Sequence, residues 1–577
     1  MKHRIRRSLY ILIAVMLILP VSVVFANWLP APATIVDDLA IGGNPSSVYG
    51  IAFEPTKQTF FANGRHWIFY DNNDSDLVYK TAPTSGVFGA EIELINNSGL
   101  YGWEFAVWFD EPTTTVHMAR HNMTPNPDEV QYRMGTPNAD GTITWAAVWQ
   151  TVATVPAVLV NWRTTICVDE LGYPWVAWVD TDGTNDFGII YVESSSTKNG
   201  TWTEDVTTVM RAGSGGLAED NTGTMTGSPI DLDIGLNQPT VTVAGTFDIT
   251  IPLGGSGTAA TGGWVVDGSP KALVEGVNTI TVDPAGAGTI DLTMTLNEHV
   301  WFVALTPINN EGDLIELEWS AENIASHDVG LYASTFNTDT NTWSTRETVV
   351  AEGSFHAARW DAFSFYDLGA SMFVAYTNLA GSIMVRGRSQ IQTWDTAPAA
   401  DEIKAHGGDI LIPTISGYEL GDGGVGDNLI CIVSGATNIW YATHDYAEDL
   451  ADWNAFIEAW EVPDPVNDYF SRHIASYKYY SPVGFAWQWT DDSEATDTVQ
   501  YWWIDQDQLG LYEGGLSTVA VPMANLVPLI FLVFGVFLIL ALAFADSINI
   551  KILIIIAIAA IVLLAFLSSI NGLINSF

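Results

Sequence analysis

The chain has 577 residues, with 66 Asp and Glu against only 21 Lys and Arg, so its formal net charge is −45 at pH 7. A body this acidic argues against nucleic acid as a partner, and two cysteines exclude a disulfide framework. We expect both, Cys167 and Cys431, to be small buried apolar residues. Aromatic residues at 12%, with 50 Gly and 23 Trp, are typical of many short strands joined by tight turns, which favours an all-β body.

Residues 1–26 have the pattern of a secretory signal peptide. A basic start is followed by an apolar run over 9–19 and by the sequence Val24-Phe25-Ala26 at the expected cleavage position. An uncleaved signal anchor is the alternative, because the apolar run is long for a signal peptide. Either one predicts that the body of the chain is exported.

The segment 162–202 shows the repeating unit of this body. Apolar runs at 165–168, 175–179 and 189–192 are separated by Gly, Pro, Asp and Asn, and a fourth run opens at Trp202. This pattern predicts antiparallel strands joined by tight loops. Four strands in about 50 residues is the size of one β-propeller blade.

Copies of the second strand and of the third recur along the chain and give the blade count. The second strand has counterparts at 65–71, 314–320, 372–378, 428–435 and 484–490, with a weaker copy at 115–120. Seven copies predict a seven-bladed β-propeller. We expect blades one to three within 27–210 and blades four to seven within 297–506.

The last repeat supplies only three clear strands, whereas the short apolar run around Ile35 has no blade of its own. Pairing the two would complete the last blade and leave no open sheet edge. The sequence therefore predicts an N-terminal strand that closes the ring.

Residues 211–296 interrupt the repeat. Short Thr-, Val- and Ile-rich strands alternate with Gly-rich turns, and the Trp-rich pattern of the blades is missing. We expect a small inserted β-sandwich of Ig-like style, with a disordered loop as the alternative.

The C-terminal part predicts a membrane anchor. After a spacer at 507–524, the segment 525–567 contains two apolar runs, 526–545 and 552–567, which we expect to form a transmembrane helical hairpin. With the body outside, the connecting residues 546–551 would be cytoplasmic. The expected location is the cell membrane or envelope, with the propeller on the extracellular side.

Four repeats end the turn between their third and fourth strands in Thr-Trp, at Trp145, Trp202, Trp343 and Trp394. This resembles a degenerate form of the Asp-box (BNR) repeat of sialidase-like β-propellers, and the whole chain resembles uncharacterised exported proteins of that kind from archaeal and environmental sources. The resemblance implies that these turns lie opposite the ligand face. It also implies that the four tryptophans are structural.

Three arginines begin the innermost strands of blades three, five and seven and are our candidate ligand-binding residues. They are Arg163, Arg359 and Arg472, with Trp162, Trp360 and His473 beside them as stacking or hydrogen-bonding residues. Guanidinium groups converging on the axis would suit a carboxylate. The alternative is that each arginine pairs with an acidic loop residue.

Aspartate-rich loops between second and third strands are candidate Ca²⁺ sites, since calcium takes several oxygen ligands. The candidate ligands are Asp71, Asp74, Asp76, Asp180, Asp182 and Asp186. Solvated turns are the alternative, and no other cofactor is expected.

Two functions are consistent with these features. The first is a membrane-anchored extracellular propeller for surface recognition or adhesion, which binds glycans or another surface protein. The second is a sialidase-like glycoside hydrolase acting on acidic glycans. The resemblance implies that such a hydrolase uses a Tyr nucleophile supported by Glu. No such pair is identified in this sequence, which favours a binding function over hydrolysis.

Overall fold

The computed structural model describes strands and turns between Ala33 and Ile504, with gaps at 41–50 and in many connecting loops. The chain divides into two compact units, 1–506 and 507–577. The expected signal peptide and transmembrane hairpin lie outside the described residues. Within the described part the secondary structure is β, and no helix there could span a membrane.

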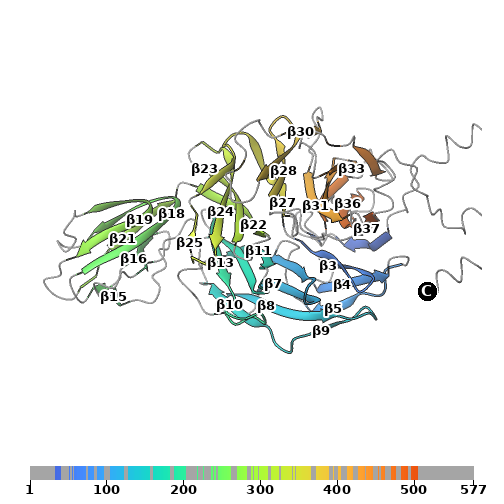
Figure 1. Cartoon of the computed structure of the whole chain (residues 1–577), viewed down its shortest axis with the longest axis horizontal. Coiled ribbons are helices and arrows are strands. Elements are labelled where there is room, and N and C mark those ends of the chain that lie inside the picture. Colours follow the sequence, from blue (N-terminus) through green and yellow to red (C-terminus); the bar gives the residue numbers. More distant parts are fainter. Residues whose placement is uncertain are drawn as a thin grey trace, which may run out of the picture. The chain divides into compact units, whose positions relative to one another are not determined.

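Seven antiparallel sheets are described outside 217–296 (Figure 1), numbered here in chain order. The first contains β2 (Thr59–Ala62), β3 (Arg65–Asp71), β4 (Leu77–Pro83) and β5 (Ile92–Ile95); the second β6 (Phe105–Asp110), β7 (Thr115–Asn122), β8 (Asp128–Pro137), β9 (Ile143–Trp145) and β10 (Gln150–Val155); the third β11 (Val160–Val168), β12 (Pro174–Thr181) and β13 (Gly188–Ser194). The fourth contains β22 (Glu298–Ile308), β23 (Leu314–Asn323), β24 (Val329–Asn337), β25 (Thr342–Trp343) and β26 (Glu347–Val350).

The fifth to seventh sheets repeat the arrangement. The fifth contains β27 (Phe355–Ser364), β28 (Met372–Asn378), β29 (Ile383–Arg388) and β30 (Asp401–Lys404); the sixth β31 (Ile412–Glu419), β32 (Asp427–Ser434), β33 (Asn438–Asp445) and β34 (Ile457–Glu461); the seventh β1 (Ala33–Ala40), β35 (Tyr469–Ala475), β36 (Val483–Asp491) and β37 (Thr496–Ile504). These sheets contain the strand copies recognised in the sequence.

Each sheet packs on the next through apolar faces. The first strands β6, β11, β22, β27, β31 and β35 contact one another in this order, and β2 contacts β6 and β36. Between the third and fourth sheets, Trp175 and Trp319 are buried in one cluster that also contains Cys167. Both cysteines are buried, as predicted.

The N-terminal strand lies in the seventh sheet. β1 pairs antiparallel with β37, with Thr34 opposite Gln500 and Val36 opposite Val499. The first and seventh sheets also pack together, because Ile68 and Tyr501 share one buried cluster. The predicted pairing of the N-terminal strand with the last repeat is therefore present.

The insertion forms two sheets of its own (Figure 1). One contains β14 (Leu217–Ala218), β16 (Gly235–Asn237), β18 (Gly245–Ala260), β19 (Lys271–Val282) and β21 (Asp291–Leu296); the other contains β15 (Met225–Thr226), β17 (Thr240–Val241) and β20 (Gly288–Thr289). Strand structure thus replaces the alternative of a disordered loop for the described residues of 217–296.

The Thr-Trp turns have a structural role, as expected. In the turn before Trp145, Asp140 Oδ1 accepts hydrogen bonds from Thr142 N at 2.9 Å and from Thr142 Oγ1 at 2.7 Å. Gly141 has φ +93° there, which favours glycine. The Trp145 ring packs edge-on against Phe69 of the first sheet at 6.4 Å between centroids, so the turn joins neighbouring sheets.

A buried ion pair links sheets that are far apart in the sequence. Lys57, just before β2, donates to Asp361 Oδ2 on β27, and both residues are almost fully buried. The same oxygen accepts from Thr414 Oγ1 at 2.6 Å and from Ile415 N at 3.0 Å on β31. The carboxylate of Asp361 therefore holds the first, fifth and sixth sheets together.

We predict that Lys57→Met destabilises the protein by about 3–5 kcal/mol, because it leaves the Asp361 carboxylate buried without its cation. Urea unfolding would measure the loss. Lys57→Met/Asp361→Asn should lose less, because the neutral amide oxygen can still accept from Thr414 and Ile415. Equal losses in the single and double variants would contradict this account.

Candidate functional site

The three candidate arginines occupy matching places in their sheets. Arg163 lies opposite Val179, immediately after an irregularity in the pairing of β11 with β12. Arg472 lies opposite Gln488, also immediately after such an irregularity. Arg359 precedes Trp360, where regular pairing of β27 with β28 resumes. The backbone therefore brings all three to the same register position, at the sheet end that carries the loop between second and third strands.

The fourth sheet has Phe302 at this position, after a similar irregularity in β22. Arg163 is half-buried, and its guanidinium carbon lies 4.2 Å from the centroid of the Phe302 ring. Arg359 is also half-buried, and burial lowers the pKa of its guanidinium below the usual value. Because β22 contacts both β11 and β27, the two arginines lie on either side of the strand that carries Phe302.

The other predicted ligand residues divide into two groups. Trp360 is only 1% exposed and packs in the core between the fourth and fifth sheets, so its role is packing and not stacking on a sugar. The side chains of Arg472, His473 and Trp162 lie outside the described residues, although their backbones belong to β35 and β11.

Carboxyl groups gather at this same sheet end. Asp71 ends β3 and is almost fully buried, as is Glu104 just before β6. Burial, together with the negative charges of Glu104 and Asp76, raises the pKa of Asp71 to about 9. Asp71 is therefore protonated at neutral pH, and its Oδ1 has no hydrogen-bond partner among the described residues.

The predicted calcium sites are only partly visible. Asp74, Asp182 and Asp186 and the side chain of Asp180 lie outside the described residues. Around Asp71 the chain forms a hydrogen-bonded turn, with Asp76 N donating to Asn72 Oδ1 at 2.9 Å. No group of three potential metal ligands is assembled among the residues that the structure describes, so calcium binding stays a prediction.

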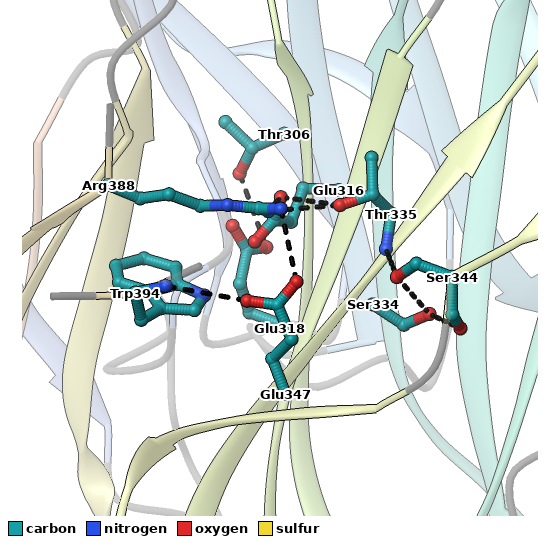
Figure 2. A network of polar contacts seen from close by, with 9 residues as sticks. All are labelled: Thr306, Glu316, Glu318, Ser334, Thr335, Ser344, Glu347, Arg388 and Trp394. Atoms are coloured by element: carbon teal, nitrogen blue, oxygen red, sulfur yellow. Dashed lines mark hydrogen bonds and ion pairs between the residues drawn. The ribbon is translucent and has the colours of Figure 1, made fainter. Parts of the chain in front are cut away.

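Sequence reasoning missed a second carboxylate cluster, between the fourth and fifth sheets (Figure 2). Glu316 and Glu318 lie on β23 and are completely buried. Arg388, the last residue of β29, forms an ion pair with Glu316 and a second one with Glu347 at 3.2 Å. The signal was present in the sequence, because two glutamates on one face of an otherwise apolar strand need partners.

Hydroxyl groups complete the cluster, as Figure 2 shows. Thr335 Oγ1 donates to Glu316 Oε2 at 3.0 Å, and Thr306 Oγ1 donates to Glu318 Oε2 at 3.3 Å. The Oε1 atoms of both glutamates have no hydrogen-bond partner among the described residues. One arginine thus faces three carboxyl groups, two of which are completely buried.

Burial dominates the electrostatics of this cluster. It raises the pKa of Glu316 to about 7 despite the opposing charge of Arg388. Burial and the neighbouring Glu316 raise the pKa of Glu318 well above its usual value. The cluster therefore holds at least one proton at neutral pH.

Strand register places this cluster away from the arginines. Glu316 pairs with Thr335. Thr335 lies two residues before Asn337, which pairs with Thr342 at the base of the turn that leads to Trp343. Phe302 instead pairs with Ser320, four residues further along β23, which corresponds to about 13 Å. The Arg388 cluster therefore belongs to the end with the Thr-Trp turns and stabilises the interface between two sheets.

No protein-family model matches the chain, and no curated protein is similar to it. An ulvan lyase, which is a polysaccharide lyase, is 10% identical, with a TM-score of 0.41 over 82% of this chain and 96% of its own. The α-L-arabinanase of Penicillium chrysogenum complexed with arabinobiose is 10% identical, with a TM-score of 0.35 over 70% and 99%. A lectin of Burkholderia pseudomallei is 11% identical, with a TM-score of 0.33 over 71% and 100%.

We predict that stability falls as pH rises from about 4.5 to 7, since folded Glu316 keeps a proton that the unfolded chain releases. In Glu316→Gln, the free energy of unfolding should no longer fall by the amount that Glu316 contributes between these pH values, which is on the order of 2 kcal/mol. Urea midpoints at several pH values would measure it. The matched control is the exposed Glu93→Gln, and a wild-type pH slope in Glu316→Gln would contradict the assignment.

Proposed function

We propose that the protein is a seven-bladed β-propeller that binds anionic glycans at the sheet ends carrying Arg163, Arg359 and Arg472. The seven sheets are the blades, and β1 closes the ring. The observation that supports this proposal is the shared register position of the three arginines: regular pairing resumes at Arg163 and Arg472 after an irregularity, and at Trp360, next to Arg359.

Charge scarcity strengthens this proposal. The chain has only 21 Lys and Arg, and three of them occupy one repeated position. An arginine fork binds a carboxylate through two parallel hydrogen bonds. Most other charged side chains of this chain are acidic and would repel a carboxylate. Association should therefore speed up with moderate salt, because screening weakens the long-range repulsion before it weakens short contacts.

The anchor is part of the proposal. A signal peptide at 1–26 and a transmembrane hairpin within 525–567 would hold the propeller outside the membrane, with the short spacer 507–524 keeping it close to the surface. The partner is then a glycan or a glycosylated surface protein, and the biological role is recognition or adhesion.

We predict that Arg163→Ala or Arg472→Ala weakens binding of carboxylated glycans at least tenfold, because a charge-assisted hydrogen bond contributes about 1.5–3 kcal/mol. A glycan array followed by calorimetry on the full chain would measure this loss. Arg346→Ala is the matched control, since Arg346 also lies over an aromatic ring, that of Tyr332, in another part of the fold. Unchanged affinity in both test variants, with normal unfolding curves, would refute the binding site.

The topology has its own test. With the body outside, a cysteine introduced at Ser547 should resist a membrane-impermeant thiol reagent in intact cells and react after the cells are opened. Labelling in intact cells would place the connecting loop outside and refute the predicted orientation.

A second candidate function is hydrolysis of acidic glycans, and the buried carboxyl pair favours it. Asp71 is protonated at neutral pH and lies near Glu104, so it could donate a proton to a glycosidic oxygen while a second carboxylate assists. Release of product from acidic glycosides, lost in Asp71→Asn, would establish hydrolysis. Binding without turnover would leave recognition as the function.

A further inference from the structure

We propose that Arg120 and Arg133, which both contact the ring of Trp149 in the second sheet, form an additional binding site for one anionic group of a carbohydrate, a sulfate ester or a carboxylate. This Arg120–Arg133 site contains none of the three arginines of the first strands. The choice of a carbohydrate rests on the proposed function, whereas the choice of an anion does not.

The geometry brings two cations to one ring. The guanidinium carbon of Arg120, on β7, lies 4.4 Å from the centroid of Trp149, and that of Arg133, on β8, lies 5.5 Å from it. Trp149 precedes β10 and is half-buried against the cluster shared by the first and second sheets. Contact with one indole ring therefore brings both guanidinium groups to the same place.

The two guanidinium groups have few partners. Arg120 is 7% exposed, and it donates through Nη2 to Gln131 Oε1 at 2.8 Å. Its Nε is buried and has no hydrogen-bond partner among the described residues. Arg133 is half-buried and donates through Nε to the carbonyl oxygen of Ala146 at 2.8 Å.

Local charge favours one negative ligand group. Gln131 donates in turn to Glu129 Oε2 at 2.7 Å, and this carboxylate favours the charged form of Arg120. Burial and the positive charge of Arg133 nevertheless lower the pKa of Arg120 to about 10. The two arginines and Glu129 together carry one net positive charge when all three are ionised, and a sulfate ester or a carboxylate would neutralise it.

Simple clamping of Trp149 is the competing explanation. It accounts for the ring contacts, but it requires two like charges to share one partly dry site in a chain that has few cations to place. A bound oxyanion would offset these like charges, because it can accept hydrogen bonds from both guanidinium groups.

The test uses the full chain carrying Arg163→Ala, Arg359→Ala and Arg472→Ala, so that the proposed site at the first strands is removed. Calorimetry would compare sodium sulfate, a sulfated trisaccharide, a uronic acid trisaccharide and a neutral trisaccharide. We expect the sulfated or the uronic trisaccharide to bind and the neutral one not to bind. Adding Arg133→Leu should weaken binding about tenfold or more, and Arg346→Leu should leave it unchanged.

Arg133→Lys covers the case in which the leucine variant does not fold, because it keeps the charge but loses the planar fork, and it should give an intermediate loss. Binding of sodium sulfate alone would support the anion site and refute the carbohydrate carrier. The proposal is overturned if no anion binds the background variant, if the neutral trisaccharide binds equally well, or if Arg133→Leu and Arg133→Lys both keep the affinity. These outcomes are independent of binding at Arg163 and Arg472.

Discussion

The ion pair between Lys57 and Asp361 is the contact on which the arrangement of the sheets most depends. The apolar clusters among the described residues join neighbouring sheets, whereas this pair and its hydrogen bonds connect the first sheet with the fifth and sixth. A buried charge is costly unless hydrogen bonds and an opposite charge compensate for its lost hydration. Asp361 accepts four hydrogen bonds, including one from Ala362 N at 2.9 Å. These hydrogen bonds form only at specific distances and angles. They therefore favour one arrangement of the strands over other arrangements that would bury a similar apolar area.

Basic residues are scarce in this chain, and the surroundings of several of them indicate their roles. Lys57 neutralises a buried carboxylate, and Arg388 does the same between the fourth and fifth sheets. Arg163 lies on an aromatic ring instead, as do Arg120 and Arg133. A cation over an aromatic face is held without a full opposite charge, whereas one in a buried ion pair is already neutralised. This difference separates the arginines that stabilise the fold from those that are candidates for a ligand.

The sequence predicted local structure well because each strand carries its own pattern. The alternation around Trp175 and its copies identified the strands, and the deficient last repeat led to the pairing of Val36 with Val499. Contacts between distant parts were not predictable in this way. Lys57 and Asp361 are 304 residues apart, and no repeated pattern in the sequence indicates that they pair. Trp360 was misplaced for a related reason, since its burial depends on the neighbouring sheet and not on its own strand.

The pairing of β1 with β37 affects how the protein can be made. The chain is synthesised from its N-terminus, so β1 leaves the ribosome first and its partner strand β37 leaves about 460 residues later. Until then, β1 presents unpaired N–H and C=O groups that another chain could bind. Its sequence, Ala33–Ala40, contains two adjacent aspartates, whose charge opposes stacking with copies of itself. A chain that ends before β37 would leave this strand exposed permanently, which would mark incomplete products for proteolysis.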